Sequence, residues 1–69
     1  MNLGAYIRNK RTIFRLTQQE LAERSGVGLR FVKELESGKK TTRMDKVNQV
    51  LNLFGEELVP QTIQNNEDR

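Results

Sequence analysis

Two short amphipathic segments that lie almost end to end constrain the fold of this chain most. The first begins at Thr17, which forms a capping-box pattern with Glu20, and it ends near Gly26. The second, about residues 29–37, begins only three or four residues later. So short a connection, with a glycine in it, forces two helices to cross steeply instead of lying side by side. The pattern predicts a bent helix pair over residues 17–37.

Helical spacing of apolar residues extends on both sides of this pair. Residues 3–13 fit a first helix and residues 44–54 a fourth, with Thr42 and Asp45 as a further capping box. The residues expected in the core are Leu3, Ile7, Leu21, Ala22, Val27, Val32, Leu35, Val47, Val50, Leu51 and Phe54. The sequence predicts an all-α, compact domain of four to five helices over residues 1–56. Residues 57–63 should form a short strand or an extended arm, and residues 64–69 a disordered tail.

The chain has 69 residues, with neither cysteine nor histidine. One domain of this size buries only about 60% of its unfolded surface, and no disulfide or thiolate metal site reinforces it. Without these residues, and with no carboxylate pair in a catalytic context, we predict no enzyme activity, no cofactor and no metal. No apolar run approaches the length of a membrane span or a signal peptide. We expect a cytoplasmic protein.

Charge is distributed unevenly along the chain. Residues 1–46 carry 11 Lys or Arg against 5 Asp or Glu, and residues 47–69 carry 1 against 4. The folded part is therefore cationic and the tail acidic. A cationic surface attracts polyanions, of which the nucleic acid backbone is the commonest in the cytosol. A solvated surface with a chance excess of cations is the alternative.

The run LTQQELAERSGV at residues 16–27 is the most informative in the chain. It resembles the first half of the Cro/CI-like helix-turn-helix, also called the XRE family. The resemblance continues through VKELESGK at residues 32–39 and through residues 44–47 and 53–55, and it spans residues 3–55. It implies a DNA-binding domain whose second motif helix enters the major groove. The protein would then lie on the bacterial nucleoid when it is bound to DNA.

Three positions, Arg11, Arg15 and Phe31, have particular structural consequences. By resemblance, Arg11 and Glu36 should form a partly buried ion pair between the first and third helices; a plain surface arginine is the alternative. Arg15 stands where many relatives have glycine, so we expect a tighter or strained turn there. Phe31 replaces a residue that is usually small; it either packs against the first helix or reaches the DNA as an apolar contact to thymine methyl groups.

Base reading should come from the first turn and a half of the third helix. The predicted positions are Gly28, Leu29, Arg30, Lys33 and Glu34. Arg30 and Lys33 are the main candidates, because guanine offers two acceptors to cations in the major groove. Leu29 suits a thymine methyl group. Glu34 either accepts from a cytosine amino group or orients a neighbouring cation.

Backbone contacts are predicted at two places. Gln18 begins the second helix, where the family places an amide and the helix N-terminus against a phosphate. The loop after the third helix combines three cations with two hydroxyls, a composition that favours phosphate binding over a merely solvated run. Its predicted phosphate contacts are Lys39, Lys40, Thr41, Thr42 and Arg43.

One monomer presents a small surface, so we expect a homodimer that reads palindromic double-stranded operator DNA, with half-sites about one helical turn apart. The predicted dimer contacts are Asn48, Asn52, Leu58 and Val59. Residues 27–39 and 53–59 look most like the small HipB-type antitoxins, in which a strand after the last helix pairs across the dimer. That resemblance implies an autorepressing antitoxin with a HipA-like serine/threonine kinase toxin as partner. A stand-alone phage- or host-type repressor, an RNA-binding protein and a protein-only adaptor remain open.

Overall fold

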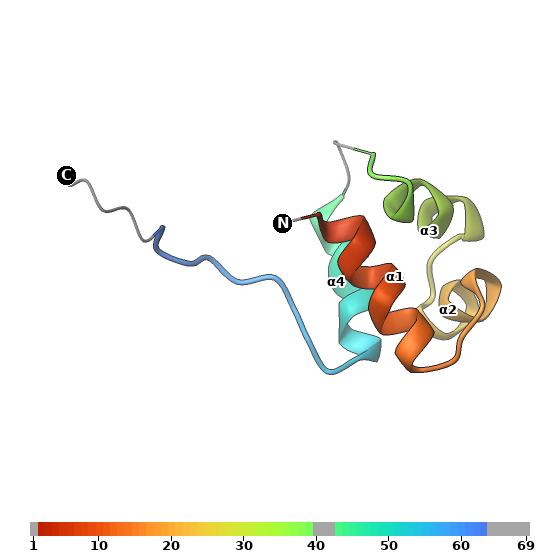
Figure 1. Ribbon diagram of the computed structural model, residues 1–69. Coiled ribbons are helices and arrows are strands. Elements are labelled where there is room, and N and C mark those ends of the chain that lie inside the picture. Colours follow the sequence, from red (N-terminus) through yellow and green to blue (C-terminus); the bar gives the residue numbers. More distant parts are fainter. Residues whose placement is uncertain (1, 40–42, 64–69) are drawn as a thin grey trace.

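The computed structural model describes residues 2–39 and 43–63, and this part of the chain is helical with no strand. The helices are α1 (Leu3–Ile13), α2 (Gln18–Ser25), α3 (Leu29–Glu36) and α4 (Met44–Leu53). Helix α3 packs on α2 and α1, and α2 also packs on α4 (Figure 1). The all-α helix-turn-helix architecture predicted from the sequence is thus confirmed.

The core is a single apolar cluster to which all four helices contribute. Its buried members are Ile7, Leu21, Ala22, Val32, Leu35, Val47, Val50 and Leu51. Three residues predicted for the core, Leu3, Val27 and Phe54, lie at its margin and are only partly buried. None of the described helices is both long and apolar enough to cross a bilayer.

The turn between α1 and α2 contains one residue in an unusual backbone conformation. Arg15 has φ 59°, the left-handed region that a side chain other than glycine enters at a cost. The capping box at Thr17 is formed, since the hydroxyl accepts from the Glu20 amide and the Glu20 carboxylate accepts from the Thr17 amide. Helix α2 ends at Gly26, which is also left-handed with φ 82°. The predicted strain at Arg15 is therefore present in the backbone.

Two helix ends differ from the prediction. Helix α3 stops at Glu36, with Ser37 as its C-cap, one residue earlier than expected. Helix α4 begins at Met44 as predicted and ends at Leu53, one residue earlier than expected; its N-cap is Arg43, which makes no side-chain cap hydrogen bond. The expected capping box needed Thr42, which lies outside the described residues. The Asp45 carboxylate is instead paired with the Arg43 guanidinium at 2.6 Å.

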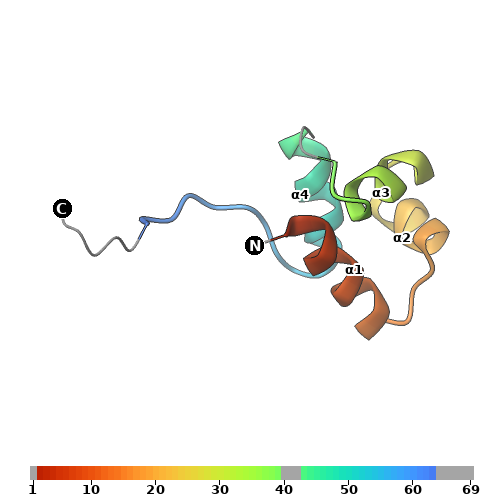
Figure 2. The same ribbon diagram turned by 45° about the horizontal axis from the view of Figure 1, so that its top comes forward.

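After α4 the chain turns at residues 54–55 and continues over residues 56–63 without regular secondary structure; we call residues 54–63 the arm. Its first part runs antiparallel to α1: the Phe54 ring packs against Phe14 in a tilted arrangement, with centroids 4.9 Å apart and the ring planes at 59°. Glu56 lies further back along α1, bonded to Tyr6 and Lys10. The rest of the arm leaves the globule on the side opposite α2 and α3, as both views show (Figures 1 and 2).

Helices α1 and α3 approach each other very closely at Gly4. A Cβ atom built on this glycine would overlap the carbonyl oxygen of Leu35 and lie 3.2 Å from the Cα atom of Glu36. Only a residue without a side chain fits this crossing. The close approach brings the C-terminal end of α3 against α1 and so fixes the orientation of α3.

Candidate nucleic-acid interface

The outer face of α3 carries the cations predicted to read bases. Arg30, in the first turn, has a side chain that is 91% exposed. Lys33 is exposed one turn later, while Val32 and Leu35 on the opposite side are buried. This division follows from helical periodicity, because residues three and four apart share a face. The helix therefore presents positive charge outward and is held from behind by the core.

Glu34 lies between two cations on this face. Its Oε2 atom accepts from Nε of Arg30 at 3.3 Å, and its Oε1 atom accepts from Nζ of Lys39 at 3.2 Å. The hydrogen bond from Lys39 is the main reason that the pKa of Glu34 is lowered; the Coulombic attraction of Lys39 and the bond from Arg30 act in the same direction. Of the two predicted roles for Glu34, the geometry favours orienting a cation.

The start of α3 is more apolar than its middle. Leu29 is partly buried and packs against the core, so only part of its side chain is available to a thymine methyl group. Gly28 is the N-cap and has no atom within 4 Å of where a Cβ would stand. Phe31 also packs on the core, with Nζ of Lys46 in α4 5.8 Å from its ring centroid. That contact with α4 was not among the predicted environments for Phe31.

Arg11 and Glu36 form a two-point ion pair between α1 and α3. The Nε atom of Arg11 lies 2.7 Å from Oε2 of Glu36, and its Nη2 atom lies 3.0 Å from Oε1. The side chain of Glu36 is only 2% exposed. Arg11 also donates through Nη1 to the carbonyl oxygen of Leu16 at 2.8 Å, which fastens the turn before α2. One guanidinium thus joins α1, α3 and the entry to α2.

Gln18, predicted to contact a phosphate, belongs to the same cluster. Its side-chain amide donates to Oε1 of Glu36 at 3.1 Å, so its orientation is fixed from inside the protein. Arg8 approaches the same oxygen at 3.8 Å and remains mostly exposed. Neither the Gln18–Glu36 bond nor the role of Arg8 was predicted from the sequence, since both depend on how α1, α2 and α3 meet in space.

The loop after α3 is described only in part. Lys39 and Arg43 are exposed, and each has a carboxylate partner, Glu34 and Asp45 respectively. The predicted phosphate contacts at Lys40, Thr41 and Thr42 lie outside the described residues. The two described cations lie on either side of these three residues in the sequence.

The residues predicted to contact a second copy are in different environments. Asn48 and Leu58 are bonded to each other, since Oδ1 of Asn48 accepts from the Leu58 amide at 2.8 Å. Asn52 is exposed, and Val59 is 67% exposed. Within one chain, therefore, Asn48 holds the arm, and Asn52 and Val59 remain free to meet a partner.

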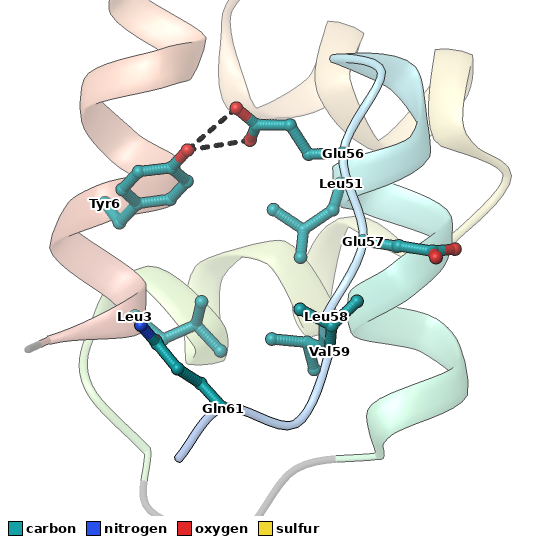
Figure 3. Close-up of a pocket in the computed structure, with 8 residues that line it drawn as sticks. All are labelled: Leu3, Tyr6, Leu51, Glu56, Glu57, Leu58, Val59 and Gln61. Carbon is teal, nitrogen blue, oxygen red and sulfur yellow. Dashed lines mark hydrogen bonds between the residues drawn. The ribbon is translucent and has the colours of Figure 1, made fainter. Parts of the chain in front are cut away.

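A pocket of about 350 Å³ lies where the arm passes α1 and α4. Leu3, Leu51 and Leu58 turn toward it, and the Tyr6 hydroxyl reaches across to Glu56 (Figure 3). The hydroxyl is 2.8 Å from each carboxylate oxygen of Glu56, and Nζ of Lys10 is 3.0 Å from Oε2. This cluster was not predicted from the sequence, although Tyr6 and Lys10 have the spacing of neighbours on one helix face.

A steeply crossed α2–α3 pair, held by α1 and α4 and exposing a cationic α3 face, defines the helix-turn-helix class of domains. Comparison with known proteins agrees with this assignment. A family model described as Helix-turn-helix matches residues 7–60, and the chain belongs to that family. The chain is also similar to a protein of Sinorhizobium fredii named "Uncharacterized HTH-type transcriptional regulator y4mF". The two are 48% identical over 54 residues, which cover 78% of this chain and 71% of the relative.

Proposed function

We propose that this protein is a sequence-specific transcriptional repressor that binds double-stranded DNA with α3 in the major groove. The observation that carries the proposal is the exposure of Arg30, a cation whose side chain is 91% exposed on the first turn of a helix whose other face packs in the core. Lys33 is the second base reader. The relative's printed name, an HTH-type transcriptional regulator, supports the regulatory part.

Phosphate contacts would orient the domain on the duplex without reading sequence. Gln18 offers an amide at the N-terminus of α2, already positioned by Glu36. Lys39 and Arg43 stand on the two sides of the loop after α3. We extend this proposal to Lys40, Thr41 and Thr42, which the loop carries between them.

The test is selection of binding sites from a pool of random duplexes, followed by affinity measurements on the selected site and on random DNA. A bidentate contact to guanine contributes about 1–3 kcal/mol of discrimination. Arg30→Ala should therefore lower the ratio of specific to random affinity by about 5- to 150-fold. Arg24→Ala, an exposed arginine of α2, is the matched control and should keep the ratio. Equal loss on both kinds of DNA for Arg30→Ala would contradict the proposed role.

We further propose that the protein binds a palindromic operator as a homodimer. Two copies double the contact surface and match the two-fold symmetry of a palindrome. Asn52 and Val59 are the exposed residues available for this interface, with Asn48 and Leu58 placing the arm. Removal of residues 57–69 should weaken dimerisation in sedimentation experiments while the helical circular dichroism signal stays. If the truncated protein dimerises as strongly as the full chain, the arm does not contribute to the interface.

The finer proposal is that the repressor is the antitoxin of a HipA-like kinase. Its support is the resemblance of residues 27–39 and 53–59 to HipB-type antitoxins. Co-purification of the native complex with its upstream promoter DNA tests it, because an antitoxin should bring a kinase-like protein in stoichiometric amount. Purification without such a partner would favour the runner-up, a stand-alone repressor.

A further inference from the structure

Glu34 is positioned to orient Arg30, the proposed base-reading residue one turn earlier on α3. It is four residues after Arg30 on the exposed face of α3, and its two oxygens accept from two different cations. We propose that Glu34 is a specificity-determining positioning residue: it holds Nε of Arg30 so that the two terminal guanidinium nitrogens face a guanine. This inference rests on the proposed function, because it concerns how the same helix face reads DNA.

The guanidinium of Arg30 has enough donors to bind Glu34 and a guanine at the same time. Arginine has five N–H donors in a planar fork, and a bidentate contact to guanine O6 and N7 uses a parallel pair of them. The bond to Glu34 uses only the single donor on Nε. Both terminal nitrogens therefore remain available. An exposed arginine without such a partner samples many rotamers and loses that freedom when it binds.

Lys39 fixes the other side of the carboxylate. It follows α3 and binds Oε1 of Glu34, whereas Arg30 binds Oε2, so the carboxylate is held between the two. The lysine ammonium has three donors, and one bond to Glu34 leaves two for a phosphate. Glu34 thus connects a predicted base contact with a predicted backbone contact. Since both oxygens already accept from cations, orienting Arg30 is favoured over reading a cytosine amino group directly.

The experiment compares Glu34→Ala with Glu23→Ala, which removes the same charge from an exposed position on α2. The probes are the duplex selected by the wild-type protein and a copy in which the guanine that depends on Arg30 is replaced by adenine. The measured quantity is the ratio of the affinity for the guanine duplex to that for the adenine duplex. On a logarithmic scale, we expect this ratio in Glu34→Ala to be at most about half of the wild-type value. Its affinity for random duplexes should be unchanged or higher, because a negative charge is lost. Glu23→Ala should keep the wild-type ratio.

A double variant separates positioning from direct reading. Glu34→Ala introduced into Arg30→Ala should cause no further loss of the guanine preference, because both changes act through one contact. Full guanine preference in Glu34→Ala would overturn the inference. So would a lost cytosine preference that persists in the Arg30→Ala background, because Glu34 would then read a base itself. If wild type and Arg30→Ala select the same sites with the same ratio, the proposed base reading itself fails, a distinct result.

Discussion

Gly4 in α1 lies so close to the carbonyl oxygen of Leu35 in α3 that no side chain fits between the two helices. This contact is where the N-terminal helix supports the end of the helix proposed to enter the DNA groove. Alanine is normally better than glycine in a helix by about 1 kcal/mol. Here the helix crossing should reverse that preference.

Gly4→Ala should therefore destabilise the protein. Overpacking costs about 1–3 kcal/mol against a gain of about 1 kcal/mol in helix propensity, so we expect a net loss of up to about 2 kcal/mol in the free energy of unfolding. Urea denaturation followed by circular dichroism measures it. Asn9→Ala, an exposed change in the same helix, should be neutral or slightly stabilising. A Gly4→Ala protein at least as stable as wild type would show that α1 and α3 can separate without cost.

Arg15→Gly should stabilise the protein. The φ angle of 59° costs a residue with a Cβ about 1 kcal/mol, and glycine removes that cost. Arg15→Ala removes the same charge but keeps the strain, so it is the matched control. We expect the glycine variant to melt about 4–8 °C above the alanine variant. Equal melting temperatures would show that the turn is not strained.

Arg11→Ala should be strongly destabilising. It leaves the buried carboxylate of Glu36 without its two-point partner, and breaking such a pair costs about 3–5 kcal/mol. The melting temperature should fall by at least about 12 °C. The double variant Arg11→Met with Glu36→Leu removes the uncompensated charge and should recover much of the loss. A fall below about 4 °C for Arg11→Ala would mean that water or Gln18 satisfies Glu36.

Acid should loosen the arm through Glu56. The hydrogen bond from Lys10, and then that from Tyr6, lower the pKa of Glu56 below its ordinary value of 4.5. A lowered pKa in the folded state gives stability that is present above pH 4.5 and is lost as the pH falls through the folded-state pKa. Glu56→Gln should reduce the fall in melting temperature over this acid range. Glu57→Gln is the control, because the neighbouring Glu57 side chain points away from α1 (Figure 3). Identical acid profiles for wild type and Glu56→Gln would contradict the coupling.

Most helix ends were predictable because they depend on local chemistry. Thr17 and Glu20 cap each other within one turn, and Gly26 supplies the left-handed residue that ends α2. The end of α4 near Phe54 was also close to the prediction. Its start at Met44 was as predicted, although Arg43 precedes it without the expected side-chain cap.

The site was predictable in its outline and less so in its connections. Periodicity alone places Arg30 and Lys33 on the exposed face of α3. The partner of Gln18 was not predictable, because Glu36 reaches it only after α1, α2 and α3 have packed. Leu29 is further inside than a base-reading position suggests. Such contacts are tertiary, and no local pattern of residues encodes them.

The arm was the least predictable element. Residues 57–59 fit either a strand or an extended segment, and a strand needs a partner that one chain does not supply. Instead, the Glu56 carboxylate at the start of the arm accepts a hydrogen bond from Tyr6 and pairs with Lys10, both on α1. These pairings join residues about fifty positions apart, so their spacing in the sequence carries no signal.

The direction in which the arm leaves has a practical consequence. Residues 60–63 extend from the flank of the globule that faces away from α2 and α3 (Figures 1 and 2). A fluorophore, an affinity tag or a fused enzyme joined through this segment would hang clear of any duplex lying against α3. The molecule can therefore be immobilised or labelled through residues 60–63 while α3 stays accessible.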